Sequence, residues 1–257
     1  MAWRKFPYPD ASYVYTVAEL KKTWKRLHAG DAEPFPKDVA VADAWIAFHA
    51  GEFERAARQG LETGLSGYAV ANKASCIYAT YLEKSSEKKL ALFQAVAERC
   101  EQQQAQQPNN AAGFYWHAYA LGRHAQGISV VKALMQGIGS KVRSSLEASL
   151  RLAPRHADAH IALGVYHAEI IDKVGALVGG LTYGASKDES IRHFQIALKL
   201  NPESAIARVE YADALVMLEG KKKMSQAIAL CEEAAALEPF DAMERLDIER
   251  ATEELEE

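Results

Sequence analysis

The stretch YADALVMLEGKKKMSQAIALCEEAAALEP, residues 211–239, decides the fold of this chain. Small and apolar residues recur in it at helical spacing, first over 211–218 and again over 227–234. Gly220 and three lysines separate the two patterns, and Pro239 follows the second. Because proline cannot continue a helix but suits the start of one, the stretch predicts a helical hairpin followed by a new helix.

Three earlier segments end in the same way. A helical pattern closes on a proline in EQQQAQQP, LEASLRLAP and FQIALKLNP, and another helical pattern starts a few residues later. Such self-similarity is the mark of a repeat architecture. The prolines, which are separated by 46, 48 and 37 residues, are Pro108, Pro154, Pro202 and Pro239.

The last stretch resembles the tetratricopeptide repeat, whose pattern W-x2-L-G-x2-Y…A-x3-F…P covers about 34 residues. The signature positions correspond, without insertion, to Tyr211, Ala214, Leu215, Leu218, Ala227, Cys231, Ala234 and Pro239. The preceding repeat matches at Leu163, Gly164, Phe194, Ala197 and Pro202, with His160 and His167 at the aromatic positions and Ser190 at the small one. The resemblance implies an all-α, right-handed solenoid of helix pairs with capping helices.

Two of the repeats are longer than this pattern, and the excess lies in the same place in both. HAQGISVVKALMQG at 124–137 aligns with HAEIIDKVGALVGG at 167–180. We interpret the excess as an extension of the first helix, which continues through GALVGGLTYGAS and turns at Gly184. Gly179 would then pack this helix against the extension at 128–137, because small residues let helices approach closely. Ser186 or Asp188 would cap the next helix.

The elongated repeats resemble those of a group of bacterial tetratricopeptide proteins. They are also similar, more loosely, to the repeat domain of the regulator-of-microtubule-dynamics proteins. That second resemblance implies hydrophobic ligands or membrane contact-site partners, which some members of the wider group are implicated in binding. We divide the chain into an N-terminal arm and capping helix at 1–37, a solenoid at 38–240 with the elongated repeats at about 110–202, and a C-terminal capping helix at 241–257.

Composition and charge exclude several classes of protein. The net charge of −4 argues against a general nucleic-acid binder, which usually carries a basic excess. No apolar run is long enough to span a bilayer, and the N-terminus has no apolar core of a secretory signal, so we expect a cytoplasmic chain. The cysteines, Cys76, Cys100 and Cys231, are few and widely spaced, and we expect buried thiols rather than a disulfide framework or a metal site.

No catalytic or phosphate-binding motif stands out, so we expect a protein that is not an enzyme and has no cofactor. GALVGGLTYGAS lacks the Lys-Ser/Thr pair of a phosphate loop, and no strand precedes it. A metal site from His124, His167 and Glu169 is an alternative, but we expect no metal. The histidines at repeat positions, which are His117, His124, His160 and His167, instead replace signature aromatics and are expected to hydrogen-bond between helices.

The leading functional hypothesis is a scaffold that binds a protein or peptide through a concave face built by the first helices of the repeats. The residues expected to contact the partner are Asn72, Tyr78, Tyr115, Tyr119, Arg123 and Arg208. An alternative is a carrier of an apolar small molecule or lipid, held in a groove between the extensions at 128–137 and 171–184. Its expected lining is Ala133, Leu134, Ala176, Leu177 and Leu181. A third alternative is an accessory component of a solute transporter.

Overall fold

The computed structural model describes residues 3–256, without the side chains of Val130, Val131 and Leu134. These residues form helices joined by short turns, and no strand occurs among them, which confirms the all-α prediction. They divide into two compact units that are described separately below. Unit 1 comprises 3–28, Glu33–Ala153 and Phe240–Met243, and unit 2 comprises Ala29–Ala32, Pro154–Pro239 and 244–256.

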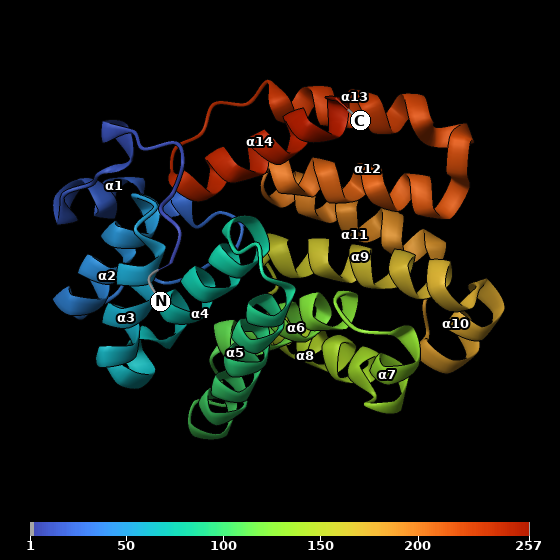
Figure 1. Ribbon diagram of the computed structural model, residues 1–257, viewed down its shortest axis with the longest axis horizontal. Coiled ribbons are helices and arrows are strands. Elements are labelled where there is room, and N and C mark those ends of the chain that lie inside the picture. Colours follow the sequence, from blue (N-terminus) through green and yellow to red (C-terminus); the bar gives the residue numbers. More distant parts are fainter. Residues whose placement is uncertain (1–2, 257) are drawn as a thin grey trace. The chain divides into compact units, whose positions relative to one another are not determined.

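Unit 1 is a series of helical hairpins that follows an N-terminal arm (Figure 1). The hairpins pair α2 with α3, α4 with α5, and α6 with α8, and the short α7 lies in the last connection. A single turn of π-helix, Tyr78–Leu82, continues α4. The helices are α1 Val17–Leu27, α2 Val39–His49, α3 Phe53–Glu62, α4 Tyr68–Ile77, α5 Ser86–Gln106, α6 Ala111–Gln126, α7 Val130–Met135 and α8 Ile138–Leu152.

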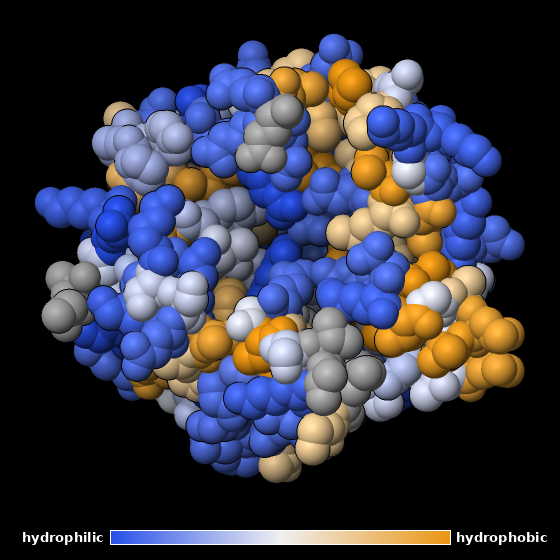
Figure 2. Space-filling model, turned by 45° about the vertical axis from the view of Figure 1, so that its right-hand side comes forward, coloured by the Kyte–Doolittle hydropathy of each residue, from blue (hydrophilic) through white to orange (hydrophobic). Residues whose placement is uncertain are grey.

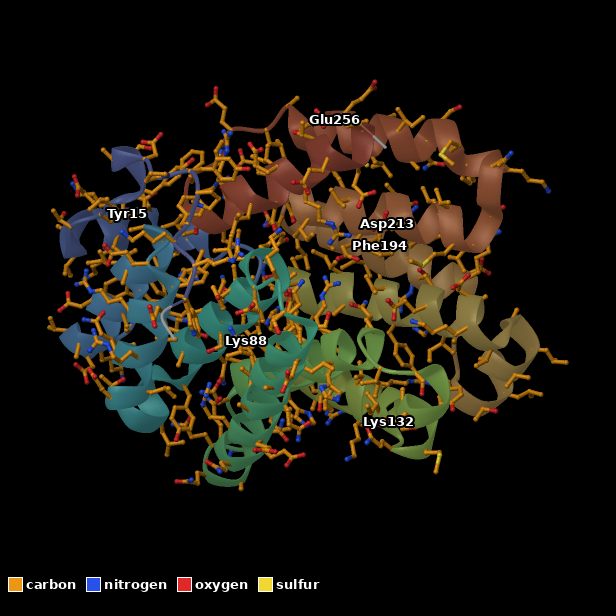
Figure 3. The ribbon with its side chains drawn as sticks, in the orientation of Figure 1. Tyr15, Lys88, Lys132, Phe194, Asp213 and Glu256 are labelled. Carbon is orange, nitrogen blue, oxygen red and sulfur yellow. The ribbon has the colours of Figure 1, made fainter. Side chains whose placement is uncertain are left out.

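Unit 2 contains two further hairpins, α9 with α11 and α12 with α13, and most of the C-terminal helix α14 (Figure 1). Its core gathers around Phe194, which is fully buried and stacks on Tyr211 of α12 (Figure 3). The helices are α9 Ala157–Val174, α10 Ala176–Tyr183, α11 Lys187–Leu200, α12 Ala205–Glu219, α13 Met224–Ala235 and α14 Ala242–Glu256.

The prolines that punctuate the sequence have the same place in every repeat. A helix begins three residues after each of them, at Ala111, Ala157, Ala205 and Ala242. The residue just before the helix supplies the cap: an Asn110 oxygen, a His156 ring nitrogen and the Ser204 hydroxyl accept backbone N–H groups of α6, α9 and α12, respectively. Such caps satisfy N–H groups that the first turn of a helix leaves without a partner.

The expectation of one extended first helix in the elongated repeat is wrong. Helix α9 ends at Val174 because Gly175 adopts φ +81°, a left-handed conformation that breaks the helix and that glycine adopts without strain. The chain then folds back as the separate helix α10, and Gly179 packs against Ile170 of α9. As predicted, the chain turns at Gly184, and the Ser186 hydroxyl caps α11 by accepting the N–H of Glu189.

Residues 240–243 belong to unit 1, although they follow the last residues of unit 2 in sequence. Asp241 forms a 2.7 Å contact with the Nδ1 atom of His49, and both side chains are buried. The Tyr15 hydroxyl donates to the carbonyl oxygen of Phe240, and Arg26 lies over the Phe240 ring. This short segment is therefore an integral part of the first unit.

Candidate functional site

Helices α4, α5 and α6 of unit 1 bring together several of the polar residues that the sequence singled out. Helix α4 is buried along nearly its whole length, and Asn72 lies at its centre with no exposed surface. A buried amide needs partners on both ends. The Asn72 Nδ2 group donates to Cys100 Sγ at 3.3 Å, and its Oδ1 atom accepts an N–H of Arg99 at 2.8 Å.

Arg99 is the central cation of this arrangement. Its half-buried guanidinium group forms the bond to Asn72 and, among the described residues, no ion pair. Burial lowers the pKa of Arg99. Electrostatic interactions with Cys100, Cys76 and Tyr68 act in the opposite direction and raise it. Burial also raises the pKa of both thiols, so neither cysteine is a thiolate that could neutralise the arginine at neutral pH.

A second arginine, on α6, acts on the Cys76 thiol. Arg123 lies 5.3 Å from the centre of the Tyr119 ring, a cation–π distance, and donates to Gln126. The Tyr119 hydroxyl is 2.9 Å from the Thr80 hydroxyl, which lies in the π-helical turn. Arg99 and Arg123 both act on the charge of the Cys76 thiol, so both positive groups lie within electrostatic reach of it.

We call Asn72, Arg99, Tyr119 and Arg123 the Arg99 site. The sequence predicts Asn72, Tyr119 and Arg123 as site residues, but it does not predict Arg99 or Thr80, the hydroxyl partner of Tyr119. The surrounding letters, VAERCEQQQ, look like an ordinary solvated helix face. The available signal was an arginine directly before a cysteine at a buried helical position.

The other residues expected to contact a partner have different roles. Tyr78 is buried, stacks on Trp3 and donates its hydroxyl hydrogen to Glu83, so it belongs to the core of unit 1 rather than to a partner-facing surface. Tyr115 is also buried, packed against Trp116. In unit 2, Arg208 holds the start of α12 through bonds to the Pro202 and Ser204 carbonyl oxygens, and it also pairs with Glu233.

The expected apolar groove does not form a closed pocket around its unit 2 members. Leu177 and Leu181 are 77% and 82% exposed on α10, and Ala176 is exposed beside them. In Figure 2, hydrophobic residues gather on the surface at the lower right, at the level of α10 in Figure 1. In unit 1, Ala133 is half-buried on α7, and the side chain of Leu134 lies outside the described part.

The repeat histidines hydrogen-bond between helices, as predicted. His117 of α6 lies 2.8 Å from the Ser145 hydroxyl of α8, and the carbonyl oxygen of Leu90 is within 3.4 Å of His124. In unit 2, His160 and His193 join α9 to α11 through their Nδ1 atoms at 2.8 Å. His167 accepts the N–H of Ser186. Within residues 3–256, no group of three His, Cys, Asp or Glu residues is arranged to hold a metal ion.

No helix in the described part of the chain has both the length and the apolar character needed to cross a membrane.

A search of curated proteins found no match to this chain. Among solved structures, the chain is similar to a thermophilic TPR protein of Thermus thermophilus. The TM-score is 0.58 and the identity 16%, over 83% of this chain and 97% of the other. That likeness establishes the tetratricopeptide-like repeat fold.

A protein-family comparison matches residues 68–257 to the regulator of microtubule dynamics protein 1-3 family. The matched part begins at the first residue of α4, so it contains the Arg99 site, all of the later hairpins and the C-terminal helix. Because the match covers well over half of the sequence, this chain belongs to the regulator of microtubule dynamics protein 1-3 family.

Proposed function

We propose that this protein is a non-catalytic scaffold that binds another protein through the first helices of its repeats in unit 1. The repeat fold supports this proposal, because stacked helix pairs typically bind peptides on the surface that their first helices line. The observation that carries it is the Arg99 site, where Tyr119 and Arg123 of the first helix α6 lie near Asn72 of the first helix α4, and Asn72 holds Arg99 of α5. Arginine and tyrosine are among the residues that are enriched at the energetic centres of interfaces.

The test is affinity capture from cells of the source organism, with Arg123→Glu compared with the wild-type protein. Arg123 is partly exposed in the last turn of α6 and lies over the Tyr119 ring, so we expect the variant to retain its fold. Arg143→Glu is the matched control, because Arg143 is partly exposed on α8 and pairs with Glu147 of the same helix. We expect a partner that Arg123→Glu loses and Arg143→Glu retains. An identical set of captured proteins for all three chains would contradict the proposal.

A carrier of an apolar ligand is a second candidate, and helix α10 is the observation in its favour. Leu177, Val178 and Leu181 are exposed on this uncharged helix, and contiguous exposed apolar surface often marks a binding site. It ranks second because these side chains face outward instead of enclosing a pocket. Native mass spectrometry of the purified protein tests it: an apolar molecule bound at one-to-one stoichiometry would favour the carrier function, and an unliganded mass would count against it.

A further inference from the structure

The arginines of this protein differ in how their charges are compensated. Most of those with described contacts pair with a carboxylate: Arg143 with Glu147, Arg192 with Glu189, and Arg250 with Glu210 and Asp213. Arg99 has no such partner among residues 3–256. The residues one helical turn away from it on α5 are Ala95, Val96, Gln102 and Gln103, none of which is acidic.

This uncompensated charge lies in an environment that makes it costly. Burial lowers the pKa of Arg99, so the charged form has lost solvation, and the nearby thiols remain neutral. Only one of its several N–H donors has an acceptor among the described residues, the Oδ1 atom of Asn72. An incoming anion would supply both the missing charge and the missing acceptors.

The same surroundings fix the geometry of the guanidinium group before any ligand binds. Asn72 is fully buried and bonded on both ends of its amide, so it holds Arg99 at a defined position. Arg123 adds a second positive charge within reach of the Cys76 thiol. A pre-positioned arginine loses little side-chain freedom on binding, which favours even a small anionic group.

We propose that the Arg99 site binds a carboxylate group of an acidic segment in the partner protein. The inference rests on the proposed protein-binding function and specifies the chemistry of its ligand. One guanidinium fork satisfies both oxygens of a carboxylate. A phosphate group has three acceptor oxygens and nearly two charges, and the planar fork of one guanidinium group matches only two of those oxygens at a time. The hydroxyl groups of Thr80 and Tyr119 bond to each other, and no lysine is among the groups that act on the charge of Arg99.

The test uses the Nε–H signal of Arg99 in nitrogen-15 NMR of the full chain at constant ionic strength. The probe is N-acetyl-diglutamyl amide, and its control is the isosteric N-acetyl-diglutaminyl amide, which carries no charge. We expect a saturable shift of the Arg99 and Asn72 side-chain signals, with a dissociation constant on the order of 1 mM. The neutral probe should bind at least about tenfold more weakly, because it lacks the charged acceptor.

Variants separate recognition from folding. Arg99→Gln should abolish saturable binding of the acidic probe, and the control Arg143→Gln, which changes a partly exposed arginine on α8, should retain it. If Arg99→Gln fails to fold, Arg99→Lys keeps the charge but not the planar fork, and it should bind several-fold more weakly. Shifts that rise linearly and equally with both probes would overturn the proposal. Tighter binding of inorganic phosphate than of the acidic probe would also overturn it, in favour of a phosphate site.

The two proposals can fail separately. If the acidic probe binds but no captured protein depends on Arg123, the protein-binding function fails and carboxylate recognition stands. If a captured partner depends on Arg123 but the acidic probe does not bind, carboxylate recognition alone fails.

Discussion

Lowering the pH should destabilise unit 2 through His193. This side chain is buried on α11, with His160 at 2.8 Å and the His167 ring stacked 5.9 Å away. Burial is the largest cause of its low pKa, and His160, Arg192 and His167 lower the pKa further, while Glu189 opposes them. Together these effects lower the pKa of His193 from 6.5 to about 4.

The sign follows from which state binds the proton. Between pH 6.5 and about 4, the unfolded chain protonates His193 and the folded chain does not, so acid favours unfolding. The stabilisation is complete above pH 6.5, decreases as the pH falls, and is lost at the folded pKa. Between about pH 7.5 and about pH 5, this linkage corresponds to a loss of roughly 2 kcal/mol of unfolding free energy.

Urea unfolding at these two pH values, followed through amide signals of α9 and α11, measures the loss. His193→Gln should remove most of the difference in unfolding free energy between the two pH values. His124→Gln, in unit 1, should leave that difference unchanged. Proton NMR of the His193 ring gives a second reading. A ring that titrates near its ordinary pKa in the folded protein, or a Gln variant with an unaltered pH dependence, would refute the reasoning.

Substitutions at three positions test packing and the buried contact of residues 240–243. Gly164→Ala should lower unfolding free energy by about 1–3 kcal/mol, because the new Cβ would lie 2.6 Å from the Phe194 ring; an unchanged urea midpoint would contradict this packing. Gly179→Leu should cost about 1–3 kcal/mol by forcing α10 away from α9, as measured by the melting temperature. Asp241→Ala should cost about 1–3 kcal/mol by removing the buried partner of His49, whereas Asp241→Asn, which keeps an acceptor, should cost less in the same melting experiment.

The sequence predicted the repeat fold because its determinants are local. Proline ends one helix and a capping residue starts the next within a few positions, as at Pro202 and Ser204. The break at Gly175 escaped prediction because apolar spacing continues across it, and only the backbone conformation of one glycine separates the two helices. The division of domains into an arm, a solenoid and a cap at 1–37, 38–240 and 241–257 remains a prediction.

The candidate site was harder to predict because it depends on pairing between helices. Asn72 and Arg99 are distant in sequence, and nothing local to either indicates that one holds the other. Tyr78 was selected for its residue type, yet burial and a bond to Glu83 give it a packing role. Residue type therefore identifies candidates, and the partners across the hairpin decide which of them can meet a ligand.

The place of residues 240–243 in unit 1 has a consequence for biosynthesis. A ribosome releases the chain from its N-terminus, so the hairpins of the first unit emerge long before the segment that completes it. Until Asp241 leaves the exit tunnel, His49 of the nascent first unit lacks its Asp241 carboxylate partner. The first unit is therefore completed only after the hairpins of the second unit have been synthesised, and a chain truncated before Asp241 would leave both units incomplete.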